Sequence, residues 1–415
     1  MRITRPAGDD HVDIDKVDLF DPGWYADGDP HPVWHWLRVN APAHRQTLPD
    51  GRRFWSVTRH ADACRVLRDH ETFTSERGTL LCALDRGDPA GGKMMAATDP
   101  PRHALLREPL NHALSARALA QRSEMLRSAV RTALDPARDG GVWDLAAAAA
   151  RLPMAFTGTL MGLPEQDWPD LIRWTWAAIA PDDPDFGTGD PDTTLATSHH
   201  ALFGYFRDRI RHRDPARDDL VGTLLGIRLD GRELRLDEAV YNCYSLLLGA
   251  NVTTPHVISA SAAAFVADPD AYRRLVDDPG LVDRTVEEAL RWSSPANHFM
   301  RYAIRDTTVA GRRISAGEAV AVWLGSANRD ASVFVDPYRF DVTRSPNRHI
   351  AFGYGPHFCV GAPLARIVLR MVFAEMRRVV TNFELAGPVR HLRSNFVAGI
   401  TRLPVRTSLA GGDGR

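Results

Sequence analysis

The sequence predicts a mainly α-helical fold with small β-sheets, formed by a single domain that spans residues 1–415. Apolar residues recur at helical spacing over most of the chain, and strand-like runs are few and short. No low-complexity linker or internal repeat divides the chain, although 415 residues would make two or three domains of average size. The ends, residues 1–20 and 409–415, are rich in charge or glycine and are expected to be loosely ordered.

The helical pattern is accompanied by recognisable start and stop signals. Asp99 and two prolines precede the first of these segments, which is a common way for a helix to begin. The longest segment is interrupted by the run Asn251–Pro255, because Pro255 removes a backbone hydrogen bond and clashes with the carbonyl of Asn251. The predicted helices cover residues 101–114, 117–134, 145–161, 165–179, 194–213, 237–267, 281–292 and 362–380.

Strands and long loops account for the rest of the predicted architecture. Strand-like runs lie at residues 54–57, 307–309, 319–324 and 397–403. Residues 74–98 are rich in glycine, and residues 181–192 are dense in Asp, Pro and Gly, so both stretches are predicted to be loops. Loops of this length in a compact protein commonly act as lids or binding loops.

The composition excludes several classes of protein. With 51 basic and 52 acidic residues the chain has no basic excess, so neither nucleic acid nor an anionic membrane is an expected partner. The acidic N-terminal segment lacks an apolar core, and no stretch approaches the ~18 apolar residues of a membrane span. We therefore expect a cytoplasmic, reduced protein whose four cysteines are not a disulfide framework.

One cysteine stands in an unusual setting. In the run Phe352–Gly361, two glycines permit tight backbone turns and Cys359 comes just before a predicted helix. Unpaired N–H groups at a helix N-terminus favour the thiolate over the thiol. No second cysteine or histidine lies at zinc spacing, so the arrangement suits an axial thiolate ligand of haem iron. A structural thiol is the alternative for an isolated cysteine of this kind.

The pattern F-G-x-G-x-H-x-C-x-G at Phe352–Gly361 resembles the haem-binding loop of the cytochrome P-450 superfamily. Further motifs follow in the order known for that family, so the resemblance covers nearly the whole chain and favours the soluble bacterial type. It implies haem b as the cofactor, Cys359 as the axial iron ligand, and haem placed between the long central helix and the helix after the cysteine loop.

A second motif is structural. Glu288 and Arg291 form an E-x-x-R pair whose spacing places both side chains on one helix face. In isolation such a pair is usually a surface ion pair. The family resemblance instead implies a buried pair behind the haem, joined by an arginine from the segment Phe334–Phe340, which is Arg339 in this sequence.

A third group consists of cationic and hydrogen-bond donor residues. His103 and Arg107 are four residues apart on a predicted helix, so they point the same way and together can bind carboxylates. The resemblance implies that these two residues hold a haem propionate. It assigns the same role to Arg301 and His357.

The central helix resembles the family's oxygen-handling helix but departs from it. Gly249 and Ala250 are small enough to lie close to a porphyrin, and Thr253 takes the place of the family's threonine. Val252 stands where the family has an acid, and a register one residue later, with Thr254 as the threonine, supplies no acid either. The Asn251 amide and its freed carbonyl are a candidate anchor for water in place of that acid.

The resemblance implies oxidation of a small organic substrate with O2 and two electrons, in secondary metabolism. Monooxygenation, as hydroxylation or epoxidation, is the favoured reaction. The missing acid leaves desaturation, ring formation, coupling or rearrangement open, and a non-enzymatic haem sensor or carrier is an alternative of another class.

Pocket walls and an electron donor are further expectations. Polar Asn297 and His298 suggest a polar group on the substrate if they face the pocket. No flavin or nicotinamide fingerprint occurs, so we expect electrons from a ferredoxin-type protein with its reductase. Two interpretations of Arg344, Arg348 and Arg366 stay open: they form a basic docking face for that donor, or they are ordinary solvated side chains. The candidate pocket residues are Leu81, Met95, Asn297, His298, Phe299 and Ile400.

Overall fold

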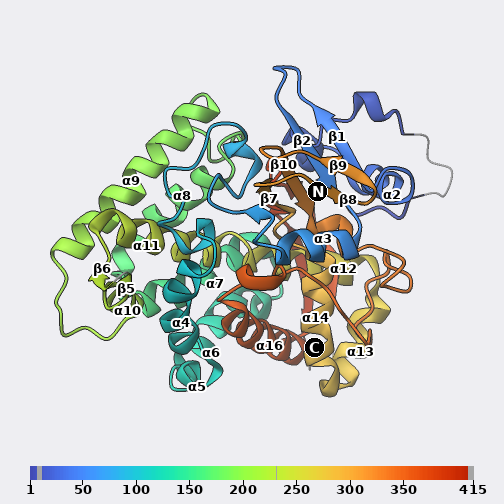
Figure 1. The fold of residues 1–415 in the computed structure, drawn as a ribbon. Helices are drawn as coiled ribbons and strands as arrows, with labels where there is room; N and C mark the ends of the chain where they lie inside the picture. The colour runs from blue at the N-terminus through green and yellow to red at the C-terminus, as the bar shows by residue number, and fades with distance from the viewer. Residues whose placement is uncertain (7–11, 230, 410–415) are drawn as a thin grey trace, which may run out of the picture.

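Helices are the predominant elements of the molecule, and a small mixed sheet lies at one side of them (Figure 1). The computed structural model describes residues 1–6, 12–229 and 231–409. Every predicted helix is present within a few residues, although residues 117–134 form two helices and the first turn of 165–179 is a 3₁₀ turn. Both predicted loops are connections without long elements of their own.

The main sheet joins segments from opposite ends of the sequence. Its strand order is β1-β2-β10-β7-β3, and β10 runs parallel to β2 while the other neighbours are antiparallel. All five residues of β10 are buried, as expected for a strand covered on both faces. The strands are β1 Ala43–Thr47, β2 Arg53–Val57, β3 Phe73–Thr74, β7 His298–Ala303 and β10 Ala319–Trp323.

The predicted central helix is two helices with a break between them. α11 spans Leu236–Asn251 and α12 spans Thr254–Ala267. Pro255 occupies the first turn of α12, where its missing N–H costs no intrahelical bond. The interruption predicted at Asn251–Pro255 is therefore confirmed, and Val252 and Thr253 lie within it.

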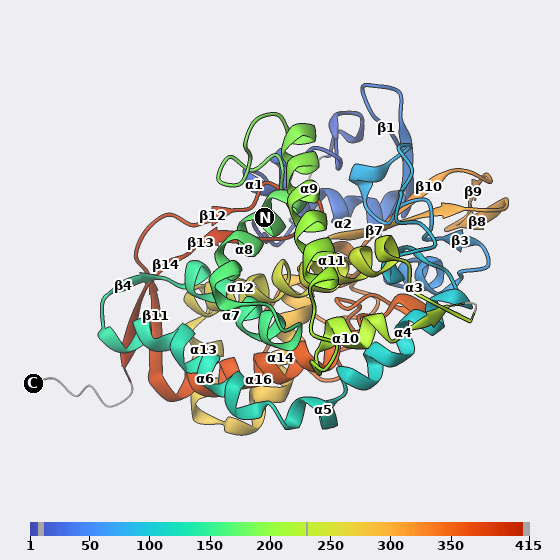
Figure 2. The same ribbon diagram turned by 90° about the vertical axis from the view of Figure 1, so that its left-hand side faces the viewer.

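Other helices surround this central pair. Figure 2 shows α8 and α9 on one side of α11, with α16 and α6 on the opposite side of the molecule. The loop between α8 and α9 lies beside α1 and β12, where Asp183 accepts a hydrogen bond from the Arg393 N–H at 2.9 Å. The helices of this shell are α4 Arg102–Ala113, α6 Ser123–Leu134, α7 Leu145–Leu160, α8 Trp168–Ile179, α9 Pro191–Arg211, α14 Val282–Ser293 and α16 Ala362–Val379.

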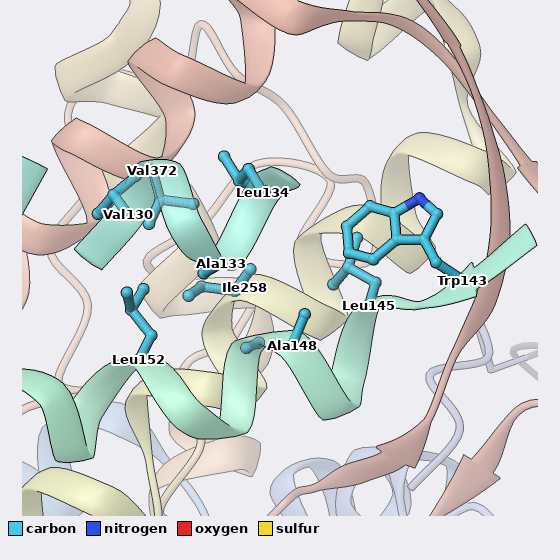
Figure 3. Close-up of a pocket in the computed structure, with 10 residues that line it drawn as sticks. Val130, Ala133, Leu134, Trp143, Leu145, Ala148, Leu152, Ile258 and Val372 are labelled. Carbon is cyan, nitrogen blue, oxygen red and sulfur yellow. The ribbon is translucent and has the colours of Figure 1, made fainter. Parts of the chain in front are cut away.

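The largest apolar cluster lies where α6, α7, α12, α14 and α16 meet. Figure 3 shows Leu145, Leu152, Ile258 and Val372 in this region, from three different helices. The cavity between them has a volume of about 10 Å³, no more than one water molecule needs. This part of the molecule is thus a close-packed core and offers no room for a substrate.

Several short elements were not predicted from the sequence. Most are helices of one or two turns or strands of two to six residues, which carry too few apolar positions for a period to show. Besides β1, β3 and β7, they are α1 Gly23–Ala26, α2 His31–Asn40, α3 His60–Arg68, α10 Leu220–Leu225, α13 Pro269–Asp277, α15 Leu324–Ala327, β4 Val142–Asp144, β5 Arg228–Leu229, β6 Arg232–Glu233, β9 Arg312–Ile314, β11 Val380–Leu385, β12 Arg390–His391 and β14 Pro404–Leu409. The first part of the predicted stretch 117–134 is α5 Ala116–Ala120. The predicted strands at 307–309 and 397–403 correspond to β8 Thr307–Val309 and β13 Ile400–Arg402.

The expectation of loosely ordered ends needs correction. Leu19 is fully buried, and the Gln46 side chain donates a hydrogen bond to the Val17 carbonyl at 2.9 Å, so residues 12–20 pack against the body of the protein. Leu409 ends strand β14. Residues 7–11 and 410–415 lie outside the described part of the chain.

Candidate active site

The cysteine loop has the tight geometry that its glycines predict. Gly353 and Gly355 adopt φ angles of 76° and 75°, in the left-handed region that favours glycine. A Cβ atom on Gly355 would lie 2.7 Å from the Cα of Arg68, so only glycine fits against α3. The Cys359 N–H donates to the Phe352 carbonyl at 2.9 Å, which fixes the cysteine three residues before α16.

The Cys359 thiol is accessible although protein atoms surround it. Burial raises the pKa of the thiol, while the N–H groups of Gly361 and Ala362 and the Arg107 charge act in the opposite direction. A buried thiol with converging donors becomes a thiolate when a cation binds it. The donor set therefore fits an iron ligand.

The middle of α11 borders an open space as well. Gly249 is exposed, and a Cβ atom added there would meet no atom within 4 Å. Val360 and Leu364, on either side of the start of α16, pack against the apolar cluster that also contains Leu247 of α11. A flat group between α11 and the cysteine loop, as predicted, would fill this space.

Four cationic or donor side chains gather beside the cysteine loop. The rings of His103, from α4, and His357, from the cysteine loop, lie 4.4 Å apart. Arg301 on β7 is 3% exposed, and among the described residues its one hydrogen-bond acceptor is the neighbouring Met300 carbonyl at 2.8 Å. Burial lowers the pKa of Arg301 to about 10, and it lowers the pKa of His103 to about 3. The predicted residues are thus brought together.

This group lacks the anions that would balance it. Arg107 and Arg301 form no ion pair with any carboxylate in the described residues, and the nearest acid, Asp99, lies 3.9 Å from His357 Nε2. A buried guanidinium without a partner is costly. Two carboxylates are therefore needed to complete the site, and two haem propionates fit that requirement.

The E-x-x-R pair is buried as predicted, but its third member is not the one expected. Arg291 Nε and Nη2 donate to Glu288 at 2.7 and 2.8 Å, and both side chains are fully buried. Arg344 Nε donates to Glu288 Oε2 at 3.0 Å. Arg339 is exposed and offers only its backbone carbonyl to Arg291, so assigning its side chain to the pair was wrong.

The same observations correct the expected docking face. The Arg344 side chain is only 8% exposed because it is bound to Glu288 and to the carbonyls of the preceding loop. Arg366 forms a two-bond pair with Glu287 at 2.7 and 2.8 Å. Of the three arginines, Arg348 is the exposed one.

The helix break places Thr253 on the side of Gly249. Thr253 Oγ1 donates to the Gly249 carbonyl at 3.1 Å, and Ala250 is half-buried on the same side. Thr254 begins α12 and is also half-buried. Val252, which occupies the position of the family's acid, is 1% exposed and packs in an apolar cluster. This position therefore carries no proton donor.

Asn251 does not take the predicted position. It lies two residues from Gly249, about 200° around the helix, and it is buried. Its Nδ2 donates to the Leu247 carbonyl at 2.8 Å, and its Oδ1 has no hydrogen-bond partner in the structure. The expectation that its amide anchors water on the cavity side is therefore corrected, since the side chain points to the opposite face of α11.

Among the predicted pocket residues, only Phe299 remains partly exposed. Leu81, Met95 and Ile400 are almost completely buried in three separate apolar clusters. Asn297 and His298 are fully buried, and protein atoms occupy both ring nitrogens of His298 and the Asn297 amide nitrogen. Internal hydrogen bonds use both ring nitrogens of His298, so the expectation that it binds a substrate group is corrected, whereas the buried Asn297 Oδ1 has no hydrogen-bond partner among the described residues. A place in the pocket wall stays a prediction for Leu81, Met95, Ile400 and Asn297.

Other residues form the wall beside Phe299. Phe396 is half-buried, and its ring centroid is 6.0 Å from that of Phe299. It packs against a group that we name the junction cluster, because it lies at the junction of α8, the helix break and the β12–β13 hairpin. The junction cluster consists of Trp176, Ile179, Ala180, Val252, Leu392 and Val397, with Ile172, Phe186, Leu248 and Phe396 against it. The sequence offered one signal, the apolar pair Phe396-Val397 in a hairpin tip.

The predicted loop 181–192 is held by ionic contacts to its neighbours. Arg390 Nη1 lies 2.6 Å from Asp185, and Arg86 of the other predicted loop lies 2.9 Å from Asp192. Asp183 is 1% exposed and accepts the backbone N–H of Arg393. The two predicted loops thus share a border above α11.

Comparison with known proteins agrees with this geometry. The family model described as cytochrome P-450 matches residues 276–406, which include both the Glu288–Arg291 pair and Cys359. Cytochrome P-450 NovI of Streptomyces niveus is 34% identical over 409 residues, covering 97% of this chain and 99% of that protein. The chain belongs to the cytochrome P-450 family. It is therefore a haem-thiolate monooxygenase with haem b as its cofactor.

Further relatives support this P-450 assignment. Linalool 8-monooxygenase of Pseudomonas putida is 32% identical over 403 residues, covering 94% of this chain and 99% of that protein. The crystal structure of OxyD, a P-450 involved in the biosynthesis of vancomycin-type antibiotics, superposes with a TM-score of 0.83 at 34% identity, covering 95% of this chain and 100% of that chain. Within the described residues of this P-450, no helix is long and apolar enough to cross a membrane.

Proposed function

We propose that this P-450 hydroxylates or epoxidises a small, largely apolar organic molecule of secondary metabolism. The observation that carries the proposal is that the Cys359 side chain is accessible and that Gly249 borders open space in the middle of α11, with Thr253 bonded to its carbonyl. The apolar junction cluster and the Phe299–Phe396 pair support an apolar substrate. The named role of OxyD in antibiotic biosynthesis supports secondary metabolism.

The protein residues divide the work between holding haem and handling protons. Haem bound through a thiolate supplies the activation of dioxygen for transfer to a substrate. Cys359 would provide that thiolate, and His103, Arg107, Arg301 and His357 would hold the propionates. Thr253 presents a hydroxyl that is hydrogen-bonded within the helix and can exchange the Gly249 carbonyl for a water molecule.

A second reaction class follows from Val252. The place of the family's acid, just before Thr253, is filled by an apolar, buried side chain, so this position supplies no carboxylate. Slow proton delivery favours desaturation, ring formation, coupling or rearrangement over oxygen insertion. Product analysis separates the two classes, because only oxygen insertion transfers an atom of labelled O2 to the product.

Electrons for either reaction come, we propose, from a ferredoxin-type protein with its reductase. Exposed Arg348 precedes the cysteine loop in the chain and offers a positive charge to an acidic partner. Replacing Arg348 by Glu should weaken transfer from an acidic ferredoxin and leave chemical reduction by dithionite unchanged.

The haem assignment is tested optically. The purified protein, reduced and exposed to carbon monoxide, is expected to show the strongly red-shifted band of thiolate-ligated haem. Cys359→Ser should abolish that band, whereas Cys82→Ser, at another accessible cysteine, should retain it. A retained band in Cys359→Ser would overturn the ligand assignment, and a wild-type protein without haem would overturn the proposed function.

A further inference from the structure

We propose that His298 is a positioning residue that sets the width of the substrate pocket by tying the predicted loop 74–98 to the tip of the β12–β13 hairpin, residues 392–399. The hairpin tip carries Phe396, which packs beside the partly exposed Phe299. The proposal rests on the proposed function, since it concerns the pocket of that same site. It replaces the expectation that His298 binds a polar group of the substrate.

The contacts of the imidazole come from three separate parts of the chain. His298 lies at the start of β7 and is fully buried. Its Nε2 accepts the backbone N–H of Leu81 at 3.1 Å, and its Nδ1 lies 3.2 Å from the carbonyl oxygen of Asn395. Trp323 of β10 packs against the ring, with centroids 5.1 Å apart. A single side chain thus links the loop, the sheet and the hairpin tip.

These contacts also determine which nitrogen carries the proton. Nε2 faces an N–H donor and must be the unprotonated acceptor, so the proton is on Nδ1 and points at the Asn395 carbonyl. Burial lowers the pKa of His298 to about 4, in agreement with a neutral ring. No donor or acceptor of the ring remains for a substrate.

Phe396 connects the hydrogen bonds of His298 to the pocket. This ring packs against His298, with centroids 5.7 Å apart, and against half-buried Phe299 at 6.0 Å. Asn297 adds a parallel bond, because its Nδ2 also donates to the Asn395 carbonyl at 3.2 Å and its N–H donates to the Phe396 carbonyl at 2.7 Å. Asn395 itself donates to the Phe20 carbonyl at 2.7 Å. The hairpin tip is therefore fixed on its His298 side and carries Phe396 with it.

Three substitutions separate the two bonds of the ring. His298→Phe keeps an aromatic ring against Trp323 and Phe396 but loses both bonds. His298→Asn retains a short donor toward Asn395, and His298→Gln retains a longer acceptor toward Leu81. His31→Phe is the matched control, because His31 is also fully buried, packs against Trp34 at 5.1 Å, and has no hydrogen-bond partner for either ring nitrogen.

The experiment compares two iron-ligating probes in the haem-loaded enzyme by optical titration. Imidazole is too small to touch the pocket walls, whereas 4-phenylimidazole fills the space beside them. His298→Phe is expected to change the 4-phenylimidazole Kd by about tenfold or more and the imidazole Kd by less than about twofold, with His298→Asn and His298→Gln between it and the wild type. His31→Phe should change neither Kd.

Equal shifts for both probes, or wild-type values in all three His298 variants, would overturn the role of His298. If His298→Phe does not bind haem, the two partial variants decide the matter, since each keeps one bond. If the His298 variants show the probe difference but the wild-type enzyme forms no product with any reductase, the proposed function is overturned and the role of His298 stays intact.

Discussion

At the scale of single residues, the helix break sets the proton chemistry. Thr253 lies on the open side of α11, whereas Val252 points into the junction cluster. We expect Thr253→Ala to consume reductant at close to the wild-type rate with product formation reduced several-fold, because the hydroxyl that manages protons is gone. The measurement is the ratio of product formed to reductant consumed. Thr254→Ala is the matched control, and an unchanged ratio in Thr253→Ala would show that the relay assignment is wrong.

Restoring the family's acid should fail for a structural reason. Val252→Glu would place a carboxylate among Trp176, Leu392 and Val397, where burial of an unpaired charge costs several kcal/mol. We expect this variant to lower the Tm and not to improve the ratio of product to reductant. Differential scanning fluorimetry together with the ratio assay checks both parts, and a stable, better-coupled variant would contradict the buried position of Val252.

The buried Glu288–Arg291 pair gives a test of which arginine completes it. Arg344→Ala removes a bond to a fully buried carboxylate and is expected to cost about 3 kcal/mol of unfolding free energy, with poor haem incorporation. Arg339→Ala should change stability by less than about 0.5 kcal/mol, because that side chain is exposed. Urea denaturation of both variants measures these losses of unfolding free energy. A larger loss in Arg339→Ala than in Arg344→Ala would show that Arg339 is the third member of the pair.

Residue identities at the site were predictable where a motif fixes them. Cys359, His103, Arg107, Arg301 and His357 lie together as the resemblance implied. The direction of a side chain in an irregular loop follows no sequence period. For this reason the sequence does not show that Arg344, and not Arg339, joins the Glu288–Arg291 pair. The same reason accounts for Asn297 and His298, whose polarity indicated a ligand while their partners are backbone groups of distant segments.

At the scale of elements, the loop between α8 and α9 depends on one buried acid. Asp183 accepts the Arg393 N–H at 2.9 Å and the Asp185 N–H at 3.0 Å. Asp183→Ala leaves both donors unpaired and should cost about 1–3 kcal/mol, with faster proteolysis between residues 181 and 190. Asp192→Ala, which breaks the exposed pair with Arg86, should cost less than about 1 kcal/mol. Equal protease sensitivity of the two variants would contradict this difference.

Long amphipathic helices and the break at Pro255 could be predicted because their signals are local. Short strands such as β4 and β14 pair with partners far away in the sequence, so their formation depends on tertiary contacts that no local pattern reveals. The same holds for α1 and α15, each a single turn fixed by its surroundings.

At the scale of the whole molecule, buried histidines should make the protein sensitive to mild acid. Burial lowers the pKa of His298 to about 4 and that of His256 to about 3, from a value near 6.5 in the unfolded chain. Below pH 6.5 the unfolded state therefore binds more protons than the folded state. The stability that the neutral, buried histidines give to the folded state is complete above pH 6.5 and is lost as the pH falls toward 4. Each histidine contributes a loss of about 2 kcal/mol between pH 6.5 and pH 5.

Thermal melts across this range provide the test. The Tm is expected to fall steeply from pH 6.5 to pH 5, a window in which carboxyl groups with ordinary or lowered pKa values remain ionised. His298→Asn should show a shallower fall than the wild type, because one of the buried titrating rings is absent. A slope identical to that of the wild type would contradict a neutral, buried His298.

The parallel pairing of β2 with β10 also has a consequence for how the chain is made. Residues 53–57 leave the ribosome long before residues 319–323, so β2 must wait with only the β1 hairpin on one edge. Non-local pairings of this kind slow folding, and until β10 is made the free edge of β2 is unpaired and prone to aggregation. A nascent chain stopped before residue 319 should accordingly be a stronger client of chaperones than the finished protein.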